Sequence, residues 1–294
     1  MKDNVFYLIL ISMRPKQWAK NIAIFAALIF SQTFFVYDHL IKSILSFIIF
    51  SLFSGSFYII NDLIDLKKDI KHPIKSKRPI ASGRLNKYSA LIVSIFILIL
   101  TGYISFLLNL YFGISLISYL ILQILYSFLL KHLAILDVFS IAAGFLIRVV
   151  AGALVISVPV SSWLLLCTIF LSLFIALGKR RSELNLLGEE ALNHRKSLKD
   201  YNIKLLDQMI IIVSASTILA YSLYTLSEET VRKFGTTNLK FSIPFVIYGI
   251  FRYLYLLYQK EEGGSPENIL VNDKPTIINI ILYGITVGIV LYIK

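Results

Sequence analysis

Long apolar runs recur along the whole chain and dominate its pattern. A helix needs about 20 mostly apolar residues to cross the hydrocarbon core of a membrane. Nine runs approach that length, at residues 19–36, 40–60, 88–107, 112–130, 135–157, 161–178, 205–226, 241–260 and 275–293. A shorter apolar stretch from Val5 to Met13 is typical of a helix that lies in the membrane interface. The pattern predicts an all-α membrane protein, with nine transmembrane helices in one integral membrane domain over residues 1–294 and a short interfacial helix before them.

The composition agrees with a membrane bundle and excludes a soluble globular domain. Of the 294 residues, 57% are hydrophobic and 16% are charged, whereas a soluble domain carries about 25% charged residues. Glycine (14 residues) and proline (7 residues) are too few for a collagen-like chain. The single cysteine, Cys167, excludes an internal disulfide and a cysteine-based zinc site.

The basic residues are distributed unevenly between the two sides of the predicted bundle. Of the 29 Lys and Arg residues, 22 lie on the side that holds the N-terminus and 5 lie on the other side, while Arg148 and Arg252 fall within spans. Because cytoplasmic loops carry the excess of Lys and Arg, this bias predicts a cytoplasmic N-terminus and an outer C-terminus. The net charge of +12 suits anionic headgroups or an anionic substrate. Nucleic acid is not an expected partner, because no soluble basic region is present to bind it.

Polar residues concentrate in two inner segments, residues 61–87 after the second span and residues 179–204 after the sixth. The two segments are four spans apart, as an internal duplication would place them. Outer connections such as residues 109–111 and 157–159 are too short to hold a site. We therefore expect a multi-pass protein of the cell membrane whose functional loops, 61–87 and 179–204, form an active site at the cytoplasmic face.

The first inner segment begins with an acidic motif in which Asp62, Asp65 and Asp69 are spaced by three and four residues. A helix that continued through it would place the three aspartates on one face, where they repel one another unless a cation lies between them. Oxygen ligands suit Mg²⁺, which shares its coordination sphere with substrate phosphates. The alternative is a solvated helix end whose acids pair with neighbouring lysines. Since polar groups at a membrane edge are costly unless they are used, we assign the metal site to Asn61, Asp62, Asp65 and Asp69.

A basic loop follows the acidic motif directly. The basic residues of this loop are Lys75, Lys77 and Arg78. They lie between Pro73 and Pro79, and Gly83 follows, which together indicate a loop of defined shape. Such side chains hold phosphate oxygens, and arginine does so through a two-pronged fork. The alternative is the ordinary positive-inside cluster, which explains the charges but not their position beside a metal site.

These motifs resemble those of a known family. The pattern NDxxDxxxD at the end of the second of nine spans is similar to the first aspartate-rich motif of UbiA-type intramembrane prenyltransferases, which binds Mg²⁺ and a diphosphate. This chain departs from the usual members after the sixth span, where GKRRSEL stands in place of a second aspartate-rich motif. That block and RPKQWAKN near the start resemble the decaprenyl-phosphate phosphoribosyltransferase branch. Two further stretches agree with the branch, GFLIR at residues 144–148 and GGSPENI at residues 263–269.

The resemblance implies a UbiA-like bundle and a Mg²⁺-dependent transfer of 5-phosphoribosyl from phosphoribosyl diphosphate (PRPP) to a polyprenyl phosphate, decaprenyl or undecaprenyl, with release of diphosphate. The product would supply precursors of cell-envelope polysaccharides. Because PRPP carries a 5-phosphate besides its diphosphate, replacing acids by Lys179, Arg180 and Arg181 is the expected direction of change. The acceptor phosphate is already anionic at neutral pH, so catalysis needs no dedicated base. It rests on charge neutralisation and on positioning.

Two other functions compete with this interpretation. One is a UbiA-type transferase that moves a prenyl group onto an aromatic acceptor, against which the missing second aspartate motif counts. The other is a polyprenyl-lipid transporter or flippase, which would place its ionisable groups near the bilayer midplane rather than at one inner face. The chain length of the acceptor and the oligomeric state stay open.

Further candidate residues lie near the inner ends of spans. We assign catalysis to Asp62 and Asp65. Arg148 is a candidate for guiding the lipid phosphate, and its alternative is a structural partner on another helix. Glu183 either binds metal or orients Lys179. The full set of candidate substrate contacts is Lys20, Asn21, Lys75, Arg78, Tyr126, Lys131, Arg148, Lys179, Arg180 and Glu183.

Overall fold

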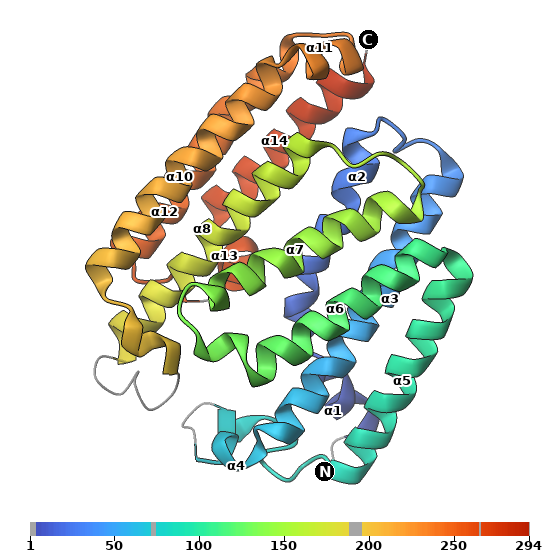
Figure 1. Cartoon of the computed structure of the whole chain (residues 1–294), viewed down its shortest axis with the longest axis vertical. Coiled ribbons are helices and arrows are strands. Elements are labelled where there is room, and N and C mark those ends of the chain that lie inside the picture. Colours follow the sequence, from blue (N-terminus) through green and yellow to red (C-terminus); the bar gives the residue numbers. More distant parts are fainter. Residues whose placement is uncertain (1–3, 72–74, 188–195, 265, 294) are drawn as a thin grey trace. The chain divides into compact units, whose positions relative to one another are not determined.

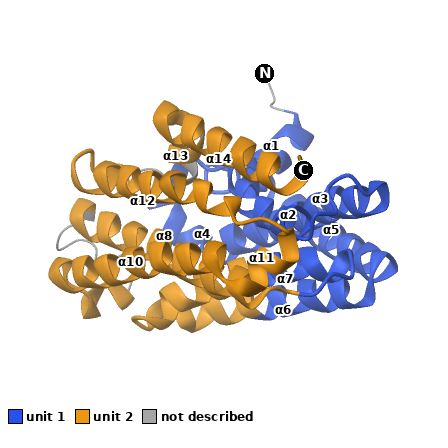
Figure 2. Ribbon diagram, turned by 90° about the horizontal axis from the view of Figure 1, so that it is seen from above, with its two compact units in different colours: residues 1–121, 147–159 blue, residues 122–146, 160–294 orange. Residues whose placement is uncertain are grey.

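The computed structural model describes residues 4–71, 75–187, 196–264 and 266–293. Every regular element in these residues is a helix, so the all-α prediction is confirmed for them (Figure 1). The chain forms two compact units, residues 1–121 with 147–159 (unit 1) and residues 122–146 with 160–294 (unit 2; Figure 2). The boundary between the units falls inside two helices, α6 (Leu110–Phe128) and α7 (Leu136–Val155).

Unit 1 is built around α3 (Tyr37–Ile64), which packs most extensively against α5 (Lys87–Leu108). Small residues allow this packing, because they let helix backbones approach closely in a membrane. Several hydroxyls of these helices donate within their own helix, as where Ser56 donates to the carbonyl of Leu52 at 2.8 Å and Ser105 donates to the carbonyl of Gly102 at 2.6 Å. The remaining elements of the unit are α1 (Val5–Ser12), η1 (Pro15–Ile24), α2 (Phe25–Phe30), α4 (Leu66–Asp69), η2 (Lys75–Lys77), residues 110–121 of α6 and residues 147–155 of α7.

Two glycines set the position of the N-terminal segment in unit 1. A β-carbon at Gly55 would lie 3.0 Å from the β-carbon of Met13, and one at Gly152 would overlap the carbonyl oxygen of Ile24. Because both positions lack a side chain, the start of η1 can approach α3 and its end can approach α7. The apolar core around this segment includes Ile24, Leu28, Phe50, Phe112, Leu116 and Val155.

Unit 2 contains α8 (Ser162–Leu187), which packs most extensively against α10 (Ile203–Leu226). The shared core includes Phe174, Leu177, Leu206, Ile210 and Leu257. The remaining elements are residues 122–128 of α6, η3 (Leu130–His132), residues 136–146 of α7, η5 (Lys196–Asp200), α11 (Glu228–Phe234), η6 (Asn238–Ser242), α12 (Ile243–Tyr258), α13 (Pro266–Asn272) and α14 (Lys274–Tyr292).

An ion pair joins α12 to the start of α14. Arg252 donates to both carboxylate oxygens of Asp273, at 3.1 and 2.7 Å, and Asp273 also accepts from the backbone amide of Thr276 as the cap of α14. The guanidinium holds the pKa of the Asp273 carboxyl well below its ordinary value, so the cap stays charged. Arg252 therefore ties two helices of the unit together.

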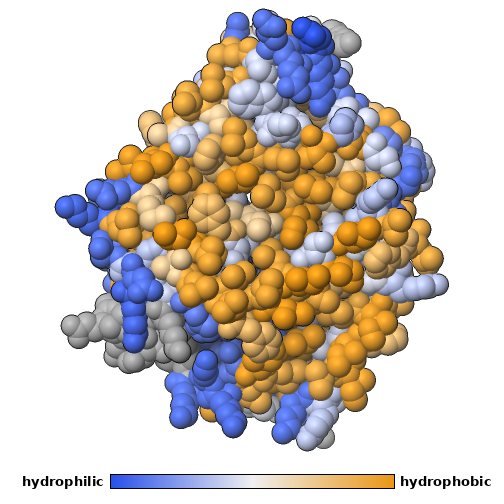
Figure 3. Space-filling model, viewed as in Figure 1, coloured by the Kyte–Doolittle hydropathy of each residue, from blue (hydrophilic) through white to orange (hydrophobic). Residues whose placement is uncertain are grey.

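Eight helices within the described residues have the length and composition of membrane spans. The face seen in Figure 3 is mostly apolar, with polar residues gathered towards its ends. The predicted first span, residues 19–36, is not among the eight, because its residues form the 3₁₀ helix η1 and the short helix α2. The other eight spans are confirmed as helices, with boundaries that differ by several residues.

The largest boundary difference is at the end of the sixth span. The sequence predicts its end at residue 178, whereas α8 continues to Leu187 and carries the GKRRSEL block within the helix. Lysine, arginine, glutamate and leucine all favour helix. Hydropathy therefore located the edge of the apolar run but not the end of the helix.

The close approach at Gly152 gives a test of this packing. We expect Gly152→Ala to destabilise the protein by about 1–3 kcal/mol, the usual cost of forcing an extra group into a packed site. Gly288→Ala on α14 is the matched control, because a β-carbon there meets nothing within 4 Å and alanine favours helix by up to about 1 kcal/mol. Thermal unfolding of the purified proteins in detergent measures both. Equal melting temperatures for the two variants would contradict the packing described for η1.

Candidate active site

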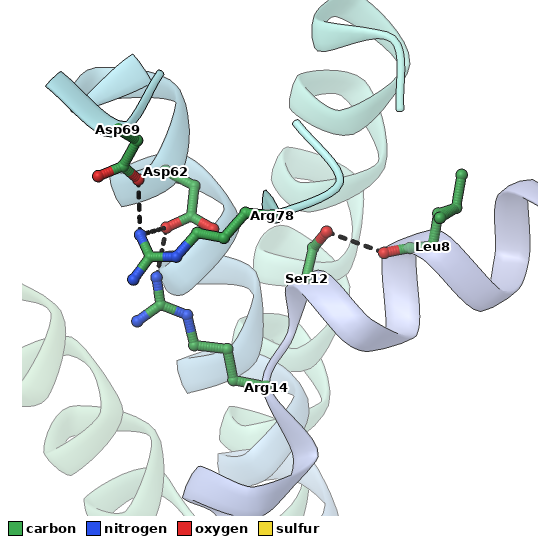
Figure 4. A network of polar contacts seen from close by, with 6 residues as sticks. All are labelled: Leu8, Ser12, Arg14, Asp62, Asp69 and Arg78. Atoms are coloured by element: carbon green, nitrogen blue, oxygen red, sulfur yellow. Dashed lines mark hydrogen bonds and ion pairs between the residues drawn. The ribbon is translucent and has the colours of Figure 1, made fainter. Parts of the chain in front are cut away.

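Two aspartates of the acidic motif share an arginine (Figure 4). Asp62 lies in the last turn of α3 and Asp69 at the end of α4, and both are buried, with 4% and 3% of their surface exposed. Arg78 Nη1 lies 2.9 Å from Asp62 Oδ1 and 2.6 Å from Asp69 Oδ2. Arg14 donates to the same Asp62 oxygen. The cluster therefore holds two carboxylates and two guanidinium groups.

The helix does not continue through the motif as the sequence analysis expected. Helix α3 ends at Ile64, and Asp65 is both its C-cap and the N-cap of α4. The motif is therefore bent at Asp65. Within the described residues, no group of three or more His, Cys, Asp or Glu side chains is arranged to hold a metal ion. The structure brings Asp62 and Asp69 together, and the assignment of Asn61 and Asp65 to the metal stays a prediction.

The pair Asp62 and Asp69 nevertheless fits Mg²⁺. This ion is usually bound through one or two carboxylates, with substrate phosphates and water completing its coordination. Both carboxylates are buried, and a cationic group already lies within hydrogen-bond distance of each. These two side chains would hold the ion, together with phosphate oxygens of a substrate.

Arg14 was not predicted as a site residue, and several contacts of the surrounding chain fix its position. Its guanidinium carbon lies 5.1 Å from the centre of the Tyr58 ring. Its backbone is left-handed, with a φ of 54°, directly before Pro15. The preceding residue, Met13, is buried against Gly55, and the indole of Trp18 donates to its carbonyl at 3.2 Å. The corner between α1 and η1 therefore directs Arg14 towards Asp62.

A second buried cluster in unit 1 joins two predicted substrate contacts to each other. Arg148 Nε donates to Asn21 Oδ1 at 2.7 Å, and Nη2 donates to the hydroxyl of Tyr119 at 3.0 Å. The guanidinium also lies over the rings of Phe50 and Tyr119. Asn21 in turn donates to Ser51 on α3 at 2.9 Å. Arg148 is 4% exposed, so its observed contacts favour the alternative in which it holds η1 in place.

In unit 2, Arg180 lies between two acids. Its Nε is 3.1 Å from Asp137 Oδ2, and its Nη1 donates to Glu183. Tyr201 donates to Asp137 Oδ1 at 2.9 Å and accepts the backbone amide of Ile135 at 2.6 Å. Burial, with the carboxylate of Asp137 beside it, raises the pKa of Tyr201 above its ordinary value, so its hydroxyl stays protonated and donates. Arg180 is 1% exposed, and its charge is offset within the unit.

Two members of this cluster, Asp137 and Tyr201, were not predicted from the sequence. Asp137 shares a face of α7 with Arg148, but the two are too far apart along the helix to pair directly. Its partners come from 43 and 64 positions further along the chain, at Arg180 and Tyr201. No local pattern indicates such a pairing.

The other candidates are divided between the units. Arg181 pairs with Asp207 at 2.6 Å and lies 4.2 Å from the centre of the Tyr258 ring, which separates it from its neighbour Arg180. Unit 1 contains Lys20 on η1 and Lys75 on η2. Unit 2 contains Tyr126, Lys131 and Lys179, on α6, η3 and α8.

Comparison with known proteins identifies the family. Residues 22–266 match the model of the UbiA prenyltransferase family. The chain belongs to this family. The resemblance of the acidic motif to UbiA-type enzymes is thereby confirmed, and Arg14, Lys20 and Asn21 lie before the matched residues.

Three curated relatives of this UbiA family member carry one name, decaprenyl-phosphate phosphoribosyltransferase. The protein from Mycolicibacterium smegmatis is 32% identical over 292 residues, which cover 96% of this chain and 91% of that protein. The protein from Mycobacterium tuberculosis is 31% identical over 281 residues, covering 94% and 92%. The protein from Corynebacterium glutamicum is 30% identical over 271 residues, covering 90% and 80%.

Solved structures support the fold. A UbiA homolog from Archaeoglobus fulgidus, bound to GPP and Mg²⁺, matches with a TM-score of 0.72 at 20% identity, covering 97% of this chain and 100% of that one. A structure described as digeranylgeranylglyceryl phosphate synthase matches with a TM-score of 0.65 at 22% identity, covering 96% and 97%. The predicted UbiA-like helical fold is confirmed.

The buried network of Arg180 predicts a graded loss of stability. Asp137→Ala removes one of two carboxylates from a buried guanidinium, which costs about 3 kcal/mol, at the low end for a broken buried pair because Glu183 remains. Tyr201→Phe removes two hydrogen bonds and costs about 1–3 kcal/mol. Tyr103→Phe on the exposed face of α5 is the control and should change little. Thermal unfolding in detergent orders the three variants. A Tyr201→Phe protein as stable as the control would contradict the network.

Proposed function

We propose that the chain is a Mg²⁺-dependent polyprenyl-phosphate phosphoribosyltransferase. It transfers 5-phosphoribosyl from PRPP to a polyprenyl phosphate, decaprenyl or undecaprenyl, for the synthesis of cell-envelope polysaccharide precursors. The observation that carries this proposal is the similarity over nearly the whole chain to three relatives that bear the name of this activity. In the reaction, an acceptor phosphate oxygen forms a bond to C1 of the ribose while the bond from C1 to the diphosphate breaks.

We assign the chemistry of this step to residues of unit 1. Asp62 and Asp69 would hold Mg²⁺, and a bound ion would supply positive charge to offset the charge that develops on the leaving diphosphate. Arg78 and Lys75 offer donors to phosphate oxygens, and the fork of Arg78 suits two oxygens at once. Asn61 and Asp65 complete the assigned motif. The acceptor phosphate is ionised at neutral pH, so no residue has to remove a proton from it.

For unit 2 we propose two different roles. Tyr126, Lys131 and Lys179 are assigned to substrate contacts. Arg180 and Glu183 act by positioning, because Arg180 is buried and paired with Asp137 and Glu183. Together these contacts hold the inner end of α8, which carries Lys179.

We also propose that the chain crosses the cell membrane nine times within a single integral membrane domain. The crossing that adds to the eight spans described above is the N-terminal segment Pro15–Phe30, in which η1 has 10 residues and α2 has 6. A 3₁₀ helix rises about 2.0 Å per residue and an α-helix about 1.5 Å, so the segment extends about 29 Å, close to the hydrocarbon thickness. The N-terminus and the active site then face the cytoplasm, and the C-terminus lies outside.

Helix α1 fits the proposed interfacial position. Its exposed side chains are apolar, with Phe6 at 73% and Tyr7 at 57% exposure, whereas Leu8 and Ser12 are buried against the unit. A helix with such a surface lies along the boundary between headgroups and acyl chains.

One alternative function deserves a direct comparison. The match to the UbiA prenyltransferase family favours transfer of a prenyl group, and the alternative takes an aromatic compound as its acceptor. Against it, the second inner segment carries Lys179, Arg180 and Arg181 on α8, and Glu183 beside them is paired with Arg180. The two functions differ in both substrates, so one assay separates them.

The test incubates the purified protein with labelled PRPP, Mg²⁺ and a series of polyprenyl phosphates, and measures lipid-extractable label. We expect transfer that EDTA abolishes and that Asp62→Ala or Asp65→Ala lowers about 100-fold or more, since groups that merely support a metal ligand cost 10–100-fold when lost. Asp38→Ala removes an acid that pairs with Lys42 at the other end of α3 and is the control. Transfer in metal-free buffer, or label transfer from a prenyl diphosphate to an aromatic acceptor instead, would overturn the proposal.

The enclosed position of Arg148 gives a separate prediction. We expect Arg148→Met to lower the melting temperature, because it removes the hydrogen bonds to Asn21 and Tyr119, and to leave the KM for polyprenyl phosphate unchanged in the enzyme that survives. The loss should be about 1–3 kcal/mol or more, since it leaves buried polar groups unpaired. A raised lipid KM at unchanged stability would instead assign Arg148 to guiding the lipid phosphate.

A further inference from the structure

Two arginines share one buried aspartate in unit 1. Asp62 Oδ1 accepts from both Arg14 and Arg78, and Arg78 also reaches Asp69 (Figure 4). The four side chains carry two negative and two positive charges, so the cluster is neutral as a whole. A carboxylate at a predicted metal site is thus already occupied by the chain's own cations.

The backbone at Arg14 indicates that this contact serves a purpose. A φ of 54° is uncommon for a residue with a β-carbon, and the following Pro15 restricts the preceding residue further. Strained residues of this kind persist where the surroundings over-determine them, and they collect at functional sites. Here the surroundings are the packing of Met13 against Gly55 and its hydrogen bond from Trp18.

We propose that Arg14 is a donor-binding residue and that Arg14 and Arg78 exchange partners during binding. In the free protein both guanidinium groups neutralise the aspartates. When a divalent cation takes Asp62 and Asp69, the guanidinium groups turn to the phosphate oxygens of the donor that arrives with it. The inference rests on the proposed function, because it takes the donor to carry a diphosphate.

Charge balance supports the exchange. A cation alone must displace arginines from the carboxylates, and a diphosphate alone must approach two carboxylates. When both bind, each takes a counter-ion from the cluster, so the two ligands strengthen one another. Such a coupling is reciprocal by thermodynamic necessity. The planar fork of arginine matches phosphate oxygens as well as it matches carboxylates.

The alternative is that Arg14 and Arg78 only stabilise the fold, by linking separate segments of the chain. In that case Arg14 ties the α1–η1 corner to α3, and Arg78 ties the loop after η2 to α3 and α4. Both roles predict a loss of stability on mutation. They differ in ligand binding, because a fastening role gives no reason for metal affinity to rise when an arginine is removed.

The test uses the full chain in nanodiscs and two separate measurements. Binding of Mn²⁺ alone is followed from the electron paramagnetic resonance signal of the free ion. Binding of labelled inorganic diphosphate at saturating Mn²⁺ is followed by equilibrium dialysis. For Arg14→Gln and Arg78→Gln we expect Mn²⁺ alone to bind about tenfold more tightly and diphosphate about tenfold more weakly, as for one charged hydrogen bond lost.

The controls separate this result from general electrostatics and from misfolding. Arg84→Gln makes the same charge change in the loop that carries Arg78. Arg84 donates there to Ser82 and to the carbonyl of Lys77. This variant should leave the affinities for Mn²⁺ and for diphosphate near those of the parent protein. Arg14→Lys keeps the charge and loses the fork, so diphosphate should still bind more weakly. Its melting temperature shows that the fold is retained.

Shifts of opposite sign in the two affinities support the exchange. Unchanged or weaker Mn²⁺ binding, unchanged diphosphate binding, or the same shifts in Arg84→Gln would overturn it. Because inorganic diphosphate is common to PRPP and prenyl diphosphates, these measurements do not depend on which of these donors the enzyme uses. Failure of phosphoribosyl transfer would therefore overturn the proposed function while leaving the exchange intact.

Discussion

Neutralisation of buried charge is the constraint on which the two polar clusters depend. A charged side chain taken out of water is costly unless a partner and hydrogen bonds replace its hydration. In unit 1 this requirement draws Arg14 and Arg78 onto Asp62, and in unit 2 it draws Arg180 onto Asp137. Each pairing joins segments that are distant in the sequence. The buried charges of each unit therefore also organise the fold around them.

Small residues make these pairings reachable. Gly55 admits Met13, which places Arg14, and Gly152 admits the end of η1, which carries Asn21 towards Arg148. In a membrane, helices gain little from burying apolar surface against one another, so close backbone packing and hydrogen bonds decide where they lie. The polar clusters and the glycines are thus two parts of one arrangement.

The sequence was sufficient for the fold class, for eight of the spans and for the family, because apolar length and the acidic motif are local signals. It did not indicate the form of the backbone at Pro15–Phe30, where a 3₁₀ helix and a short α-helix stand in place of one long α-helix. It also assumed one helix through Asp62, Asp65 and Asp69, whereas the chain bends at Asp65. The contacts of Arg14 with Asp62 and of Tyr201 with Asp137 could not be predicted, since tertiary structure brings these residues together and leaves no pattern nearby in the sequence.

The extension of α8 to Leu187 changes what the basic run Lys179, Arg180 and Arg181 is able to do. Successive residues on an α-helix point about 100° apart, so three consecutive charges cannot converge on one anion as they could in a pliable loop. Arg180 faces Asp137 and Glu183, whereas Arg181 faces Asp207 and Tyr258. Lys179 points in a third direction. The three basic residues therefore do not form a single patch. Arg180 and Arg181 stabilise α8 through contacts on different sides of the helix, and Lys179 lies on neither of these sides.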